Sequence, residues 1–341
     1  GGTAAITNSG TINSSGTSAL SDAQSGISNS GNIHVTGGTL TLTGALTDSS
    51  GGSIAIDSGA ILTTGSALTN NTGATITVSG TLTETGTAAI SNAGTITLSG
   101  GTLQDTHGAG AAAISNTGTI TSSGASTLSD SGGGISNSGQ LNVTTGTLTV
   151  SGVLTDSGTI GISSGAALTD SSGITLSGGT ISGAGTVTGA ITASGAAHIT
   201  ASGGTLEIAS AITNSGTLAL TVGSGASDRL KLDAASTATS LTFSGSTGTL
   251  ELNSSGTLTL TNLLSVGTNT VQLDGASSSL TDNAGISVST GTITGQGIIT
   301  GAITLSGGTI TQSGGTLNLT SVTGFGTING VTGAGTLTAS G

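Results

Sequence analysis

The chain has 341 residues, 64 of which are Gly, and it contains no Cys, Pro, Met, Trp or Tyr. Only 5% of the residues are charged, and the formal net charge of −12 includes just two basic residues, Arg229 and Lys231. Two cations are too few to neutralise a phosphate backbone or to hold an anionic bilayer, which excludes nucleic-acid binding and a basic membrane-binding face. The absence of Cys excludes a disulfide framework and a thiol nucleophile.

A chain so rich in Gly, Ser and Thr also has the composition of a disordered linker. Disordered segments, however, combine low hydrophobicity with high charge. Here 33% of the residues are hydrophobic, and most of these are Ile, Leu, Val and Ala, of which the branched residues favour strands. No run approaches the length of a transmembrane helix. Because the chain begins with Gly1 and Gly2 rather than Met, we expect a processed piece or a segment of a longer protein.

A short motif recurs from the first residues onward: Ile or Leu, then Ser or Thr, then Asn or Asp, with Gly one to three residues later. Its starts at Ile6, Leu20 and Ile27 are spaced by 14 and then by 7, which add to 21. Multiples of seven indicate a unit of one strand and one turn, and three such units would close a coil of about 21 residues. Asn versions start at Ile6, Ile27, Ile90, Ile114, Ile135 and Ile212, and Asp versions at Leu20, Leu46, Leu128, Leu154, Leu168 and Leu280.

Polar and apolar residues alternate within these units, for example at 39–43, 74–78 and 94–98. This period of two predicts strands with one buried and one exposed face, and Gly and Asn at their ends suit the corners. The sequence therefore predicts an all-β, right-handed parallel β-helix (a β-solenoid) with three faces and roughly 21 residues per coil. A core between three closely spaced sheets has room only for small aliphatic side chains, which accounts for there being only two Phe, Phe243 and Phe325.

A longer duplication connects two parts of the chain. Residues 4–49 and 112–157 align without gaps at an offset of 108, and 31 of the 46 positions are identical. This offset is close to five coils, and whole coils are easily duplicated because each contacts only its neighbours. With no linker or boundary visible, we expect residues 1–341 to form a single continuous β-solenoid without separate domains.

Parallel coiling stacks equivalent residues on one another, so the Asn residues of the motif are expected to form amide ladders along a corner. The candidates are Asn8, Asn29, Asn92, Asn116, Asn137 and Asn214.

The Asp residues of the motif have two interpretations. They could form a row of carboxylates for cation binding or catalysis, or each could be a turn residue that accepts hydrogen bonds from its own backbone. We favour the second interpretation, because Asn occupies the same place in other copies. The residues concerned are Asp22, Asp48, Asp130, Asp156, Asp170 and Asp282.

The remaining chemistry-bearing residues are scattered. His34, His107 and His198 lie far apart in sequence, and His34 aligns with Asn142 in the duplicated copy, which favours a solvated strand position. Arg229 and Lys231 lie beside Asp228 and Asp233, which favours local ion pairing. We predict no catalytic, cofactor-binding or metal-binding residue and no cofactor, and we expect the protein not to be an enzyme.

Several passages resemble the β-strand repeats of autotransporter passenger domains and filamentous-haemagglutinin-like adhesins. They are Ser-Asp-Arg-Leu-Lys-Leu-Asp at 227–233, Gly-Thr-Leu-Glu-Leu at 248–252, Gly-Gly-Thr-Ile-Ser-Gly-Ala-Gly-Thr-Val-Thr-Gly at 178–189 and Ala-Ile-Thr-Leu-Ser-Gly-Gly-Thr at 302–309. The resemblance implies a β-helix that is exported across a Gram-negative outer membrane to the bacterial cell surface or the extracellular space.

The expected function is accordingly a secreted cell-surface structural or adhesive rod, such as a passenger stalk or adhesin. Expected partners are copies of itself, end to end or side by side, and host or surface glycans; we expect no nucleic-acid partner and no membrane-spanning segment. One alternative is a self-assembling extracellular filament subunit. Another is an ice-binding solenoid, suggested by Thr-x-Thr pairs at Thr39/Thr41, Thr75/Thr77, Thr95/Thr97, Thr147/Thr149, Thr257/Thr259, Thr292/Thr294 and Thr336/Thr338.

Overall fold

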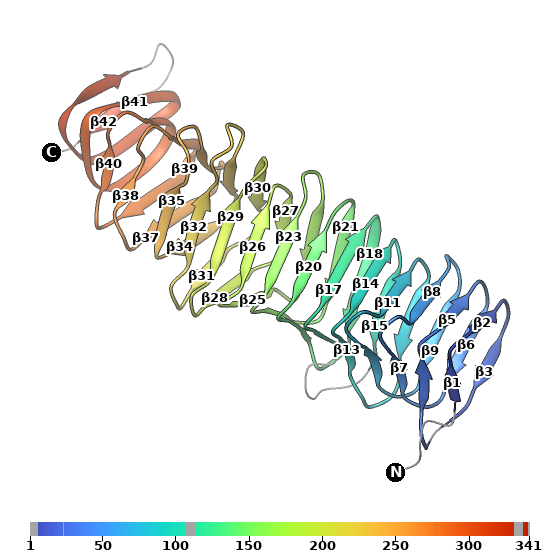
Figure 1. Ribbon diagram of the computed structural model, residues 1–341. Coiled ribbons are helices and arrows are strands. Elements are labelled where there is room, and N and C mark those ends of the chain that lie inside the picture. Colours follow the sequence, from blue (N-terminus) through green and yellow to red (C-terminus); the bar gives the residue numbers. More distant parts are fainter. Residues whose placement is uncertain (1–5, 23, 107–113, 331–336, 340–341) are drawn as a thin grey trace. The chain divides into compact units, whose positions relative to one another are not determined.

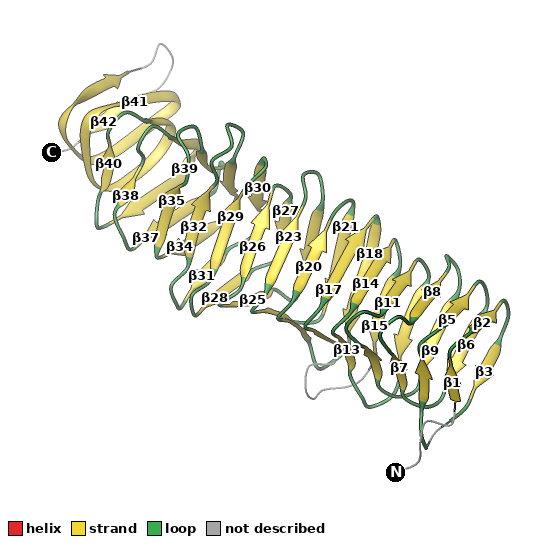
Figure 2. Ribbon diagram, in the orientation of Figure 1, coloured by secondary structure: helices red, strands yellow, loops and turns green. Residues whose placement is uncertain are grey.

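The computed structural model describes residues 6–22, 24–106, 114–330 and 337–339, which form strands and turns and no helix (Figure 2). The strands pair in parallel, coil on coil, and build a β-solenoid of about 14 turns with roughly 21 residues per turn. The predicted parallel β-helix is therefore confirmed. The chain divides into two compact units, Gly1–Ile174 and Thr175–Gly341. That the solenoid continues unbroken through residues 1–341 stays a prediction.

In the first unit every coil has three strands, which fall into three parallel stacks (Figure 1). The first stack contains β1 (Ile6–Asn8), β4 (Ile27–Asn29), β7 (Leu46–Asp48), β10 (Leu68–Asn70), β13 (Ile90–Asn92), β16 (Ile114–Asn116), β19 (Ile135–Asn137) and β22 (Leu154–Asp156). The second contains β2 (Thr11–Ser14), β5 (Asn32–Val35), β8 (Ser53–Ile56), β11 (Thr75–Val78), β14 (Thr95–Ser99), β17 (Thr119–Ser123), β20 (Gln140–Val143) and β23 (Thr159–Ile162). The third contains β3 (Ser18–Leu20), β6 (Thr39–Leu42), β9 (Ile61–Thr64), β12 (Thr81–Glu84), β15 (Thr102–Asp105), β18 (Ala125–Asp130), β21 (Thr147–Ser151) and β24 (Ala167–Asp170).

The register of the first stack explains the sequence spacings. Ile6 pairs with Ile27 at an offset of 21, and Ile27 pairs with Leu46 at an offset of 19, whereas Ile90 pairs with Ile114 at an offset of 24. The strands keep their length, so the turns absorb these differences. The duplicated segments occupy equivalent places, because β16 follows β1 by five coils in this stack.

The second unit begins with the same three-strand coils and then changes. Its last strands run through the corners without a break, so that β39 alone pairs with both β36 and β37. The strands are β26 (Thr180–Gly183), β27 (Thr186–Thr188), β28 (Ile191–Ser194), β29 (His198–Ala201), β30 (Thr205–Ile208), β31 (Ile212–Asn214), β32 (Ala219–Val222), β33 (Arg229–Leu232), β34 (Ala235–Ala238), β35 (Ser240–Phe243), β36 (Thr249–Leu252), β37 (Thr257–Leu260), β38 (Leu264–Ser265), β39 (Thr270–Asp282), β40 (Ile286–Val288), β41 (Thr292–Asn329) and β42 (Leu337–Ala339). β25 (Ile174–Ser177) lies at the unit boundary.

The core of each unit is aliphatic. Alternate strand residues point inward, and the buried apolar side chains of the described residues are Ile, Leu, Val and Ala, such as Ile33, Leu62 and Leu230. Neither Phe belongs to this core: Phe325 is 72% exposed and Phe243 is partly exposed. Among the described residues no aromatic side chain is therefore part of the buried core, and that the space between the stacks is too narrow for a ring stays a prediction.

The Gly of the repeated Asn-x-Gly motif is required by close contact between coils. A Cβ on Gly118 would lie 2.2 Å from the carbonyl oxygen of Gly94 in the preceding coil, and one on Gly139 would lie 2.1 Å from the oxygen of Gly118. A different requirement applies just before the first-stack strands, where Gly26 and Gly134 have φ values of 79° and 88°, which only Gly adopts without strain.

Candidate functional site

A column of buried polar side chains runs along the first stack, where each strand ends and the chain turns. Each member pairs in register with the member on the next coil, and the eight side chains are between 0% and 8% exposed. We call this column the polar ladder, and it consists of Asn8, Asn29, Asp48, Asn70, Asn92, Asn116, Asn137 and Asp156. Buried polar groups must be hydrogen-bonded to be tolerated, so the bonds within the ladder decide what it contributes.

Each Asn donates from its side-chain amide to the Oδ1 atom of the next coil. The distances are 2.7 Å from Asn8 to Asn29 and from Asn29 to Asp48, then 2.6 Å from Asn70 to Asn92, from Asn92 to Asn116 and from Asn116 to Asn137, and 2.5 Å from Asn137 to Asp156. All of these bonds point the same way along the stack.

The direction is fixed by a second bond of each amide group. The Nδ2 atom of Asn70 also donates to the backbone oxygen of Thr95 at 3.1 Å, and that of Asn92 donates to the oxygen of Thr119 at 3.1 Å. Turning an amide over would place its oxygen against a carbonyl oxygen. Each Asn is therefore held in one orientation by the backbone of the coil that follows it.

The ladder is broken between Asp48 and Asn70. Asp48 accepts from Asn29 through Oδ1, but a carboxylate has no proton to pass on. Within the described part of the chain, neither Asp48 Oδ2 nor Asn70 Oδ1 has a hydrogen-bond partner. Burial raises the pKa of the Asp48 carboxyl to about 6, against the opposing effect of the bond from Asn29.

The structure largely confirms the amide ladder predicted from the sequence. Asn8 and Asn29 form one part of it, and Asn92, Asn116 and Asn137 belong to the other. Asn70 is a ladder member that the sequence prediction does not include. The signal was its spacing, because Asn70 precedes Asn92 by 22 residues and Leu68 follows Leu46 by the same number. The prediction for Asn214 was wrong, because this residue pairs in register with Ala193 and its amide donates to Thr239 Oγ1 at 3.1 Å.

The Asp residues of the motif divide into two groups. As predicted, four accept hydrogen bonds from the backbone of their own turn: Asp22 from Gln24 and Ser25, Asp130 from Gly132 and Gly134, Asp170 from Ser172 and Gly173, and Asp282 from Ala284 and Gly285. For Asp48 and Asp156 the favoured interpretation was incomplete, because their side chains accept from the ladder amides instead. Burial raises the pKa of Asp170 to about 6 and also raises that of Asp282.

Three carboxyl groups are stacked on consecutive coils of the third stack, and this row is not among the features predicted from the sequence. Glu84 pairs in register with Asp105, and Asp105 with Asp130, and all three are buried. Glu84 accepts from the backbone nitrogen of Gly86 at 2.7 Å. The signal in the sequence was the spacing of Thr-Leu-Thr-Glu at 81–84 and Thr-Leu-Gln-Asp at 102–105, one coil apart.

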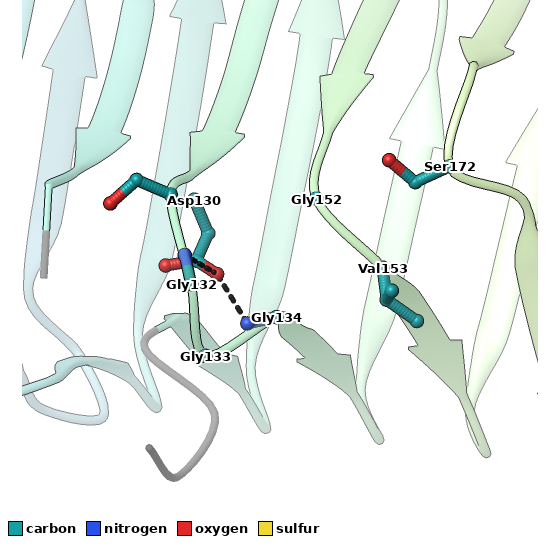
Figure 3. Close-up of a pocket in the computed structure, with 8 residues that line it drawn as sticks. Asp130, Gly132, Gly133, Gly134, Gly152, Val153 and Ser172 are labelled. Carbon is teal, nitrogen blue, oxygen red and sulfur yellow. Dashed lines mark hydrogen bonds between the residues drawn. The ribbon is translucent and has the colours of Figure 1, made fainter. Parts of the chain in front are cut away.

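The end of this row opens into a shallow hollow of about 260 Å³ (Figure 3). Asp130 Oδ2 accepts from the backbone nitrogens of Gly132, at 3.1 Å, and Gly134, and so ties down the Gly-rich turn. The rest of the lining is Ser131, Gly133, Gly152, Val153 and Ser172. None of these residues is a second acid or a His, so the hollow offers no acid–base pair for catalysis.

Both basic residues of the chain lie on β33 in the second unit. Lys231 pairs with Glu207 of the preceding coil at 2.5 Å and with Asp233 at 3.5 Å, and Arg229 pairs with Glu251 of the following coil. The hydrogen bond from Lys231 lowers the pKa of Glu207, and the same bond raises the pKa of Lys231. The predicted local pairing is thus confirmed for Lys231 with Asp233.

For Arg229 the predicted pairing with its neighbour Asp228 was wrong. Asp228 Oδ1 accepts from the backbone nitrogens of Gly203 and Gly204 at 2.8 and 3.1 Å, and Oδ2 accepts from Gly225 at 2.8 Å. The Asp228 side chain therefore points inward to bind the backbone, while Arg229 points outward across the coils. Adjacent strand residues face opposite sides of a sheet, which prevents this pair.

The His residues are not gathered into a site. His34 lies on the outer face of β5 with its side chain 33% exposed, and its Nε2 atom lies 3.0 Å from Asp57 Oδ1. His198 is exposed at the start of β29, and His107 lies outside the described residues. Throughout residues 6–22, 24–106, 114–330 and 337–339, no group of three or more His, Asp or Glu side chains could hold a metal ion.

Thr residues are aligned on two outer faces of the first unit. In the second stack, Thr75 and Thr77 pair in register with Thr95 and Thr97, which pair with Thr119 and Thr121. In the third stack a single column continues through five coils: Thr81, Thr102, Thr127, Thr149 and Thr169. Neighbouring coils lie about 4.8 Å apart and outward residues of one strand about 6.6 Å apart, so the hydroxyl and methyl groups form a regular array.

A second surface hollow, of about 410 Å³, lies in the second unit. Phe243 and Leu263 give it an apolar wall, Leu263 being 56% exposed, and Thr242, Thr268 and Asn269 add polar groups. Among the described residues no helix has the length and apolar character needed to cross a membrane. No family model, curated protein or solved structure matches this chain.

Proposed function

We propose that this chain is a secreted structural and adhesive rod of a bacterial cell surface. The observation that carries the proposal is the unbroken register of the first stack, in which eight strands pair coil on coil over an aliphatic core. Such a stack gains length by adding coils and presents its faces to solvent. Resemblance of the passages at 178–189 and 227–233 to autotransporter and adhesin repeats supports the surface location.

The physical basis of the proposed role is resistance to extension. Backbone hydrogen bonds and ladder bonds run from coil to coil, so pulling the ends apart loads many bonds at once. The Thr and Ser residues of the outer faces keep the surface hydrated with little charge. The proposal includes no catalytic activity. Hydrolysis of a polysaccharide by the purified chain, abolished when one carboxylate is changed to its amide, would contradict this part.

Electron microscopy of the purified chain tests the architecture. We expect discrete particles of uniform length that are several times longer than wide, each carrying a globular tag at one end when the chain is fused to one. Compact globules would contradict the proposal. Continuous fibres, with tags spaced along them, would instead favour the alternative that the chain is a self-assembling extracellular filament subunit, joined end to end or side by side.

Adhesion to host or surface glycans is the finer part of the proposal. The hollow beside Phe243 and Leu263 suits a sugar ring, because its apolar wall could pack against the ring face while the exposed Thr242 and Thr268 meet the hydroxyls. A glycan array probed with the full chain tests this. Binding should fall at least tenfold in Phe243→Ser and persist in Phe325→Ser, which changes the other aromatic residue. Equal binding by both variants would remove this hollow from the proposal.

Ice binding is a second candidate, favoured by the aligned Thr residues of β11, β14 and β17. A flat array of hydroxyl and methyl groups at fixed spacing can hold water in an ordered layer. The test is thermal hysteresis of the purified protein, with Thr97→Tyr in the centre of the array expected to abolish it. Thr221→Tyr, on the outer face of β32, is the control and should keep it. The absence of hysteresis in the unchanged protein would reject this function.

A further inference from the structure

The break in the polar ladder brings two buried oxygen atoms together. In the coils that follow, the Oδ1 atoms of Asn92 and Asn116 each accept from the Nδ2 atom of the preceding coil. Asn70 pairs in register with Asp48 in the same way, but Asp48 carries Oδ2 where the other residues carry Nδ2. Its Oδ2 and Asn70 Oδ1 therefore face each other, and neither has a donor among the described residues. Both side chains are fully buried.

Reorienting an amide does not solve this conflict. If the Asn70 amide were turned over, its nitrogen could reach Asp48, but its oxygen would then meet Asn92 Oδ1 and the backbone oxygen of Thr95. Those are the two atoms that its nitrogen now contacts at 2.6 and 3.1 Å. The mismatch would move along the stack without disappearing. A proton on Asp48 is the change that supplies the missing donor in place.

We propose that Asp48 is a neutral carboxylic acid in the folded protein under mildly acidic conditions, and that its Oδ2–H group donates to Asn70 Oδ1. The bond joins the short ladder of Asn8 and Asn29 to the longer one that begins at Asn70, so that hydrogen bonds run in one direction from Asn8 to Asp156. At higher pH the Asp48 carboxylate is ionised, and its Oδ2 atom is buried against Asn70 Oδ1, which is also a hydrogen-bond acceptor. Asp48 is thus a pH-sensitive joint within the first unit.

The described strands packed against Asp48 hold no other charge that would explain or oppose this behaviour. The paired strands read Ile-Ser-Asn in β4 and Leu-Thr-Asn in β10, and β8, which follows, reads Ser-Ile-Ala-Ile. His34 and Asp57 pair with each other on the outer side. Burial is the main cause of the raised pKa of about 6, and the bond from Asn29 opposes it.

The sign of the pH effect follows from this shift. The ordinary pKa of Asp48 is 3.8 and the folded value is about 6, so the folded protein holds a proton that the unfolded chain has released between these values. The stabilising contribution is complete below 3.8 and is lost as pH rises through about 6. A difference of about two pH units changes the folding equilibrium constant about a hundredfold.

Carboxyl NMR of the full chain, labelled with ¹³C at the Asp side chains, tests the proposal. One signal, identified because it is absent in Asp48→Asn, should titrate near pH 6, and the side-chain amide of Asn70 should shift with the same midpoint. Asp170→Asn is the matched control: it removes another buried acid with a raised pKa but should leave the Asn70 response intact. Titration of Asp48 near pH 4, or an Asn70 amide that does not respond, would overturn the proposal.

Denaturation by urea supplies an independent readout. Asp48→Asn restores the residue found at this place in six other coils and should fold, because its amide can donate to Asn70 at every pH. We expect this variant to match the unchanged protein at pH 4.5 and to be more stable at pH 7.5. A variant that is less stable than the unchanged protein at both pH values would show that Asp48 does not act as a donor.

Discussion

At the scale of single residues, the chemistry of Asn and Asp decides how far a buried ladder can extend. An Asn side chain both donates and accepts, so it passes a hydrogen bond from one coil to the next, whereas an ionised Asp only accepts and ends the series. Both parts of the polar ladder end in Asp, at Asp48 and Asp156, because these residues lie at equivalent places of the duplicated segments. Asn92 and Asn116 show the uninterrupted form.

Asn116→Ala is expected to destabilise the first unit by about 2 kcal/mol, since it removes the acceptor of Asn92 and the donor to Asn137 in a buried place. Chemical denaturation of the full chain measures the change. Asn13→Ala is the control, because Asn13 is exposed on the outer face of β2, and it should cost less than about 0.5 kcal/mol. Equal effects of the two substitutions would mean that the ladder bonds add little to stability.

Gly118→Ala is expected to be destabilising by about 1–3 kcal/mol through steric overpacking. The added Cβ would lie 2.2 Å from the backbone oxygen of Gly94, which cannot move without breaking the register of its coil. Gly16→Ala provides the comparison, because a Cβ at Gly16 would have no atom within 4 Å. If thermal denaturation found both variants as stable as the unchanged chain, the coils would have to be less tightly stacked than the structure indicates.

At the scale of elements, the strands differ in how they hold charge. In the second unit, Lys231 on β33 lies between Glu207 on β30 and Glu251 on β36 in the register of one column. Charges of opposite sign thus alternate from coil to coil. In the third stack of the first unit, three acids occupy consecutive coils, and Asp130 is held by its own Gly-rich turn. The same parallel register therefore produces a row of ion pairs in one place and a row of acids in the other.

Lys231→Met is expected to destabilise the second unit by about 1 kcal/mol at pH 7, because the Glu207 and Lys231 side chains are about one quarter exposed and solvent weakens the pair. The pKa of Glu207 is lowered below 4.5 by the bond from Lys231. Its contribution is therefore present above pH 4.5 and is lost as pH falls through the lowered value. Urea denaturation should show the two proteins converging as pH falls below 4. A difference that stayed constant down to pH 2.5 would contradict this electrostatic account.

At the scale of the whole molecule, each of the two units is a sum of similar coils in which each coil contacts its neighbours in the same unit. Segments 4–49 and 112–157 are similar in sequence and lie five coils apart. Equivalent residues of the two segments lie on the same stack of the first unit, so the same sequence fits at either place. Stability in such a fold is approximately additive along the chain. Nothing in the core requires a particular coil number, because the same aliphatic column continues through every turn of a unit.

Deletion of residues 27–45, one complete coil, is therefore expected to be tolerated. Gly26 would be joined to Leu46, and β1 would pair with β7 as it now pairs with β4. Circular dichroism should retain the strand signal, and unfolding should stay cooperative. Deletion of residues 27–36, about half a coil, is the control and should abolish cooperative unfolding, because every later strand would meet the wrong stack. Tolerance of both deletions would argue against a fixed three-strand coil.

The sequence by itself determined the fold class and the aliphatic core, because period-two alternation and motif spacings in multiples of seven are local signals. It also indicated most of the amide ladder and the turn bonds of four Asp residues. Only the tertiary structure decided which side chains meet between coils: Asp48 in register with Asn70, the row of Glu84, Asp105 and Asp130, and the pairing of Arg229 with Glu251. The physical reason is that turns of variable length give successive coils of the first unit offsets that range from 19 to 25. The residue that lies above a given side chain in the next coil therefore cannot be found by adding one fixed number. It is found from the backbone pairing between the strands.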